Sequence, residues 1–97
     1  MLYLNVWLTV NRPEDIDSVL AALRQCISLS RAEAGCVRYE IYHSQADRSK
    51  FLLVEHWESR AHWEAHRSGR AFQEFYQPHV IPHVTREPHI SDQLTPE

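Results

Sequence analysis

The sequence predicts an α+β protein with the element order β-α-β-β-α-β, the ferredoxin-like plan. Segments near the start, middle and end of the chain alternate between apolar and polar residues, as strands do. Two further segments carry apolar residues at three- and four-residue steps, as amphipathic helices do. The chain has 97 residues, 43% of them hydrophobic and 24% charged. These values suit one folded domain over residues 1–97.

The first strand is expected over residues 2–10, with apolar or aromatic side chains on both faces. A helix then starts near Asn11 or Arg12, with Pro13 in its first turn, where proline is well tolerated. Gly35 ends this helix or follows its end. The residues predicted to face the sheet form one stripe: Ile16, Val19, Leu20, Leu23, Cys26 and Ile27.

Two strands joined by a hairpin-length connection are expected over residues 36–44 and 51–57. Unbroken alternation would place one set of side chains of the second strand on a common face: Val37, Tyr39, Ile41 and His43. In the third strand a carboxylate shares a face with large apolar residues: Phe51, Leu53, Glu55 and Trp57.

Ser59 is a candidate cap for a second helix that runs through His66, and Ser68-Gly69 interrupts it. One or two further helical turns are expected over residues 71–76. A last strand is expected over residues 84–90, where Pro88 restricts it to an edge or to pairing with a partner chain. Residues 91–97 should fray or cross to another subunit.

If helices cover one face of the sheet, the other face still carries Trp, Tyr and Phe side chains. Such a surface should not be left in water. Two sheets packed face to face would enclose it. We therefore expect a homodimer in which the paired sheets form an α+β barrel.

The composition excludes several classes of function. A net charge of -3 argues against nucleic-acid binding, and no apolar run is long enough for a membrane span. The N-terminus lacks the basic leader of a signal peptide, and Cys26 and Cys36 are expected as free thiols in the cytoplasm, although a disulfide between them stays open. No Gly-rich phosphate loop is present, so we expect no bound cofactor.

A metal site is also not expected. His62 and His66 are four residues apart, as are His79 and His83, and this spacing can supply two ligands from one helix face. The HExxH pattern is absent and no third ligand is implied. Solvated surface histidines are the simpler interpretation of these pairs.

The stretch from Glu33 to His66 carries a more specific pattern. It reads E-x-G-C-x-x-Y over residues 33–39, F-x-x-x-E-x-W over residues 51–57, and then Ala65-His66. This resembles the antibiotic-biosynthesis monooxygenase (ABM) family. The resemblance implies a dimeric α+β barrel and one of several activities: a cofactor-independent quinol or polyketide monooxygenase, an isomerase of a phosphorylated autoinducer, or a haem-degrading oxygenase.

The sequence departs from relatives of this family in one place. Relatives often have a second histidine before the aromatic residue after the helix, and Ala71 occupies that position here, before Phe72. Haem degraders use an Asn-Trp-His set. Here Asn5 is near the expected strand, but the other two positions hold His66 and Tyr76, so haem degradation is disfavoured.

Within the resemblance, His66 occupies the cavity-facing position of the second helix and would act as a base on a phenol or enol. Its structural alternative is a bond to a carbonyl between helix and sheet. Glu55 needs a partner such as Arg38 or a histidine if it is buried, and either a structural ion pair or an acid–base role would satisfy it. Tyr39 and Asn5 would hydrogen-bond the oxygens of a substrate.

Aromatic residues in the segments around this expected cavity would bind the substrate ring, although core packing also explains them: Trp57, Trp7, Phe72 and Phe51. The sequence therefore favours a cofactor-independent monooxygenase, an oxidoreductase that combines molecular oxygen with a small aromatic or quinol-type substrate. The alternatives are an isomerase or breakdown enzyme for a small hydroxy-ketone, and a non-catalytic ligand-binding or stress-response dimer.

Overall fold

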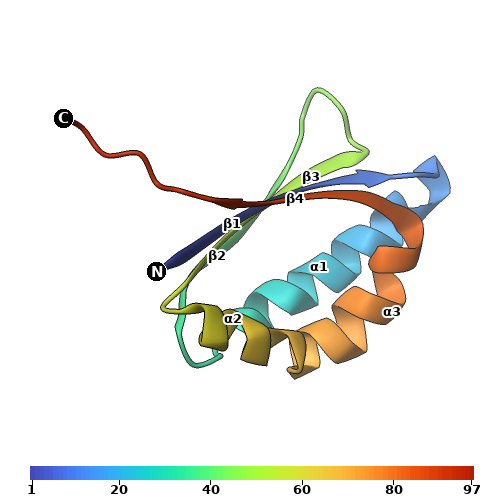
Figure 1. Cartoon of the computed structure of the whole chain (residues 1–97). Helices are drawn as coiled ribbons and strands as arrows, with labels where there is room; N and C mark the ends of the chain where they lie inside the picture. The colour runs from blue at the N-terminus through green and yellow to red at the C-terminus, as the bar shows by residue number, and fades with distance from the viewer.

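The computed structural model describes all 97 residues and contains one antiparallel sheet with helices on a single face (Figure 1). The strands are β1 (Leu2–Val10), β2 (Cys36–His43), β3 (Lys50–Trp57) and β4 (Val84–Ser91). Their order across the sheet is β2-β3-β1-β4. The predicted ferredoxin-like α+β fold is confirmed.

The helical layer contains one long helix and several short segments. Helix α1 (Ile16–Arg31) follows a 3-10 turn, η1 (Pro13–Asp15). Helix α2 (Arg60–Arg67) is followed by the π-helical turn η2 (Ala71–Tyr76), and then by the short segments α3 (Gln77–His79) and η3 (Ile81–His83). None of the helices has the length and apolar character needed to cross a lipid bilayer.

Local sequence explains where α2 begins and ends. The Ser59 side chain accepts a hydrogen bond from the backbone N–H of His62 at 3.2 Å, which confirms the predicted cap. The helix ends at Arg67, before Ser68 and Gly69, as the sequence predicts. Gly35 precedes β2 with a φ of 79°, and a side chain there would collide with the His62 ring, so glycine is required at this position.

The core lies between the sheet and the helices. Alternate residues of β1 are buried, from Leu2 to Val10, and they meet Val19, Leu23 and Cys26 of α1. Burying one such leucine or phenylalanine side chain stabilises a fold by about 1.5–3 kcal/mol. Phe51 and Trp57 of β3 are fully buried in this same layer.

Strand β2 departs from the predicted alternation. Its pairing with β3 shifts between Cys36 and Arg38, so Val37 is an extra residue in a bulge and is exposed. As a result Cys36, opposite Trp57, lies on the same face as Tyr39, not on the opposite face as predicted. One inserted residue in a strand moves the side chains before it to the opposite face of the sheet.

The edge strand β4 pairs only with β1, and Pro88 lies opposite Val6. The predicted edge position of this proline-containing strand is confirmed. Residues 92–97 have no helix or strand, and Figure 1 shows this segment leading away from the sheet. Cys26 and Cys36 are free thiols.

Candidate functional site

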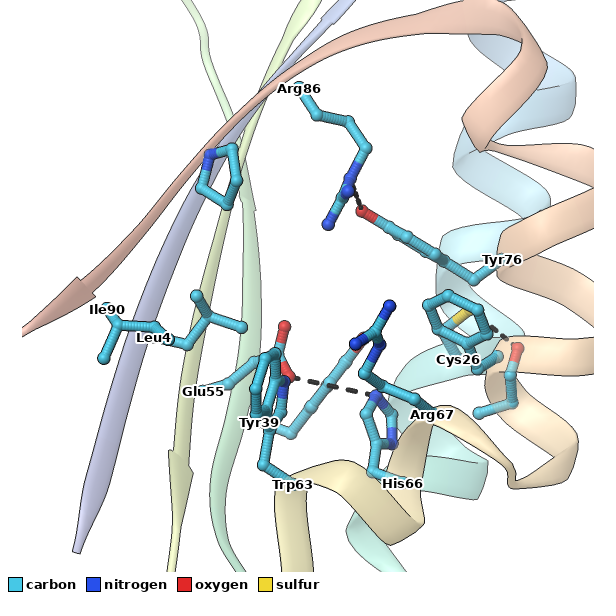
Figure 2. A pocket seen from close by; sticks show the side chains of 13 residues that line it. Leu4, Cys26, Tyr39, Glu55, Trp63, His66, Arg67, Tyr76, Arg86 and Ile90 are labelled. Atoms are coloured by element: carbon cyan, nitrogen blue, oxygen red, sulfur yellow. Dashed lines mark hydrogen bonds and ion pairs between the residues drawn. The ribbon is translucent and has the colours of Figure 1, made fainter. Parts of the chain in front are cut away.

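A pocket of about 400 Å³ lies between the helix-covered face of the sheet and the segments α2 and η2 (Figure 2). Its floor is formed by buried residues, and its rim by more exposed side chains from α2, η2 and β4. The floor residues are Leu4, Cys26, Tyr39, Glu55, His66, Ala71 and Tyr76, and the remaining lining residues are Trp63, Arg67, Phe72, Arg86, Pro88 and Ile90. Pockets with apolar walls and a few convergent polar groups are typical ligand sites.

His66 is buried in the last turn of α2 and is held from behind by Glu33. Its Nδ1 atom is 3.0 Å from Oε1 and 3.3 Å from Oε2 of the Glu33 carboxylate. A carboxylate only accepts hydrogen bonds, so Nδ1 donates the shared hydrogen. In the neutral ring this leaves Nε2 with a free lone pair, on the side that faces Glu55.

Glu55 is the second charged group of the floor and is only 4% exposed. Its Oε1 atom accepts a hydrogen bond from Nε1 of Trp57 at 3.1 Å and lies 3.9 Å from Nε2 of His66. The predicted partner of Glu55 is therefore the histidine. Arg38 contacts Glu40 instead. Burial raises the pKa of Glu55, while the nearby His66 and the bond from Trp57 oppose that rise.

Aromatic rings enclose the His66 imidazole. The ring centroids of Trp57, Tyr39 and Phe72 lie 4.6, 5.9 and 6.5 Å from that of His66. Burial, and after it the charge of Glu55, raises the pKa of Tyr39 well above its ordinary value. The Tyr39 phenol therefore stays neutral and can act as a hydrogen-bond donor.

The structure brings together four of the eight residues predicted for the site. Four of them line the pocket: Tyr39, Glu55, His66 and Phe72. Trp57 packs against His66 but does not itself line the pocket. Contrary to the prediction, the other three residues do not line the pocket: Asn5, Trp7 and Phe51. Asn5 and Trp7 point to the open face of the sheet, because Leu4 of the same strand points to the pocket.

Phe51 lies away from the pocket too. It is fully buried on the helix-covered face and stacks on His43, with 4.0 Å between the ring centroids. Phe51 is at the opposite end of β3 from Glu55 and Trp57, so it belongs to the core. The expected homodimer was argued from Trp, Tyr and Phe side chains on the open face of the sheet, and Phe51 does not lie on that face.

Several residues of the site were not predicted from the sequence: Glu33, which bonds His66 from outside the pocket, and some of the lining residues. Glu33 was part of the quoted motif but received no role, since its contact with His66 spans 33 residues. Arg86 could have been found from alternation in β4, because it lies opposite the buried Leu8. Arg67 follows His66 directly. Cys26 was predicted to face the sheet as part of the apolar stripe of the first helix, but it received no place in the site.

The histidine pairs form no metal centre in this structure, since no group of three potential ligands is close enough to hold an ion. His62 bonds the Ser59 hydroxyl at 2.7 Å, and His83 lies 3.5 Å from Asp15. The interpretation of all four histidines as solvated needs a correction, because His66 is buried.

Replacing Glu55 by Gln should raise the free energy of unfolding at pH 7 and above. The folded-state pKa of Glu55 is raised, so stability falls as the pH rises from the ordinary pKa of the carboxyl group to that raised value, and the loss is complete at higher pH. Gln removes that penalty and keeps an oxygen for the bond from Trp57. Urea unfolding from pH 4 to 8 should show the gain growing with pH.

Glu40→Gln provides a control of opposite sign for this experiment. Hydrogen bonds from Arg38 and Tyr42 lower the pKa of Glu40, so its removal should cost stability at neutral pH, though little at this solvent-screened position. If the gain in the free energy of unfolding of Glu55→Gln over the parent protein does not grow from pH 4 to pH 8, the assignment of Glu55 as a desolvated acid is wrong.

The chain also resembles known proteins. Over 66 residues it is 30% identical to the uncharacterised protein sll1783 of Synechocystis, a match covering 68% of this chain and 45% of that protein. The chain thus spans less than half of this relative. It is 27% identical over 75 residues to a Bacillus subtilis protein named "Putative monooxygenase YcnE", which covers 77% of this chain and 78% of that one.

A crystal structure described as an antibiotic biosynthesis monooxygenase superposes with a TM-score of 0.89 at 26% identity. The match covers 98% of this chain and 100% of that chain. The sequence model of the family described as "Antibiotic biosynthesis monooxygenase" matches residues 1–78, which include every element from β1 to η2. The chain therefore belongs to the antibiotic biosynthesis monooxygenase family.

Proposed function

We propose that this protein is a cofactor-independent monooxygenase that acts on a small aromatic or quinol-type substrate. Family membership supports a monooxygenase-like function in general. The observation that carries the finer proposal is the arrangement of Glu33, His66 and Glu55, which presents a fixed proton acceptor to a pocket with aromatic walls. The substrate ring would stack against Phe72 and Trp63 in that pocket.

In this proposal His66 begins the reaction by accepting a proton from a substrate hydroxyl at Nε2. Glu33 would stabilise the resulting imidazolium, and the neutral Tyr39 hydroxyl would donate a hydrogen bond to the substrate anion. The anion is electron-rich enough to reduce oxygen without a cofactor. One oxygen atom enters the ring and the other leaves as water, so a quinol and O₂ give a hydroxyquinone and H₂O.

Oxygen uptake with menadiol should exceed autoxidation in the parent protein, and this excess should fall about 100-fold or more in His66→Ala, as expected when a general base is lost. An oxygen electrode supplied with anaerobically prepared quinol measures this rate, and circular dichroism checks folding. His79→Ala is the matched control, because His79 is exposed and does not line the pocket.

Measurements of turnover with and without oxygen separate the alternative functions. The close approach of His66 and Glu55 also suits proton shuttling, as in isomerisation or breakdown of a small hydroxy-ketone, and that activity would persist without oxygen. Binding without turnover would favour a ligand-binding or stress-response dimer. If a broad panel of quinols and phenols gives no oxygen uptake above autoxidation, the monooxygenase proposal is wrong.

We also propose that the protein is a homodimer paired through the open face of the sheet. Figure 1 shows no helix on that face. Tyr42, Leu52 and Trp7 adjoin across β2, β3 and β1, and Tyr42 and Trp7 are 50% and 41% exposed. Burying this stripe in a second copy would remove apolar surface from water, and residues 92–97 would then reach the partner.

Light scattering coupled to size exclusion should give twice the chain mass of 11.4 kDa for the parent protein. Trp7→Glu should shift the mass toward the monomer, because the interface would bury an unpaired charge. Gln25→Glu makes the same charge change on the exposed side of α1 and should leave the mass unchanged. A monomeric parent at micromolar concentration would refute this pairing.

A further inference from the structure

Two arginines line the pocket from opposite sides. Arg67 extends from α2 and Arg86 from β4, and Figure 2 shows both guanidinium groups directed into the space above Glu55 and His66. They are the only lysine or arginine residues in the lining. Their convergence is notable in a chain whose net charge is -3.

Aromatic side chains hold both guanidinium groups in place. The Cζ atom of Arg67 lies 5.5 Å from the ring centroid of Trp63 and 5.8 Å from that of Phe72. The Cζ atom of Arg86 lies 5.4 Å from the Tyr76 ring, and its Nε donates a hydrogen bond to the Tyr76 hydroxyl at 2.9 Å. These cation–π contacts orient the two cations without neutralising them.

Neither guanidinium forms a salt bridge, although three other arginines of the chain do. Arg12, Arg38 and Arg70 each pair with a glutamate two or four residues away. The only carboxylate in the pocket lining is Glu55, which bonds Trp57 and faces His66. The terminal N–H groups of Arg67 and Arg86 therefore remain available to a ligand, and the charge of Arg86 also acts on Glu55, whose pKa it lowers.

We propose that the substrate is an aromatic acid whose carboxylate binds between Arg67 and Arg86. Guanidinium groups match planar carboxylates in charge and geometry. Both arginines are exposed at the rim, whereas His66 is buried at the floor. The substrate would thus carry its carboxylate at one end and its reacting hydroxyl at the other. This inference rests on the proposed function, because it names the substrate class of the same pocket.

Anaerobic calorimetry with 6-hydroxy-2-naphthoate and its neutral methyl ester tests this orientation. The two probes share one ring system and differ in charge at the end opposite the hydroxyl. The naphthoate should bind the parent protein at least tenfold more tightly than the ester. Arg67→Gln and Arg86→Gln should each weaken naphthoate binding by about tenfold or more, since each removes a charge-assisted hydrogen bond, and should change ester binding less than about twofold.

Arg24→Gln is the control for net charge, because Arg24 is exposed on α1 and does not line the pocket. Equal affinity for naphthoate and ester, or an equal loss in Arg24→Gln, would overturn the proposal. Binding is measured without oxygen and turnover of the neutral menadiol separately. Charge selectivity without quinol oxidation would count against the monooxygenase alone, and oxidation without charge selectivity against the anion site alone.

Discussion

The His66 imidazole lies between two carboxylates in the interior of the protein, and the geometry of the pocket depends on this contact. Glu33 bonds one ring nitrogen, and Glu55 lies 3.9 Å from the other. Burying a carboxylate without a partner costs several kcal/mol. The bond from the Trp57 N–H compensates part of that cost for Glu55, and the charge of His66 does so whenever the ring is protonated.

Three separate parts of the chain must fold correctly to build this arrangement. Glu33 follows the end of α1, and the left-handed turn at Gly35 then leads the chain into β2. Glu55 comes from the centre of the sheet. His66 is placed by α2, whose start is fixed by the Ser59 cap. A pocket assembled this way is preorganised, because its polar groups are oriented before a ligand arrives.

Much of the fold was predictable from the sequence because strand alternation and helix periodicity are local signals. The position of Asn5 and Trp7 was not, since alternation shows which residues share a face but not which face the helices cover. Both faces of β1 carry apolar side chains, so the alternation did not show which of the two faces packs against the helices. The bulge at Val37 likewise leaves no signature in the alternation of β2.

For the site, the family motif identified His66 and Glu55, and the need of a buried acid for a partner predicted that Glu55 would meet a histidine or Arg38. The bond from Glu33 and the convergence of Arg67 and Arg86 depend on contacts between residues distant in sequence. Such contacts follow from the packing of α2 and β4 around the sheet. Alternation within β4 could have placed Arg86 on the helix-covered face, but no spacing rule within one segment reveals which residues it meets there.

The most direct test of this account is the tautomer of His66, measured by long-range ¹H–¹⁵N correlation in ¹⁵N-histidine-labelled protein above neutral pH. The bond to Glu33 predicts a hydrogen on Nδ1 and an unprotonated Nε2 facing the pocket. Glu33→Gln should weaken this preference. A His66 ring with its hydrogen fixed on Nε2 would contradict the account, because its lone pair would then be on Nδ1, beside Glu33, and the nitrogen that faces the pocket could not accept a proton from a substrate.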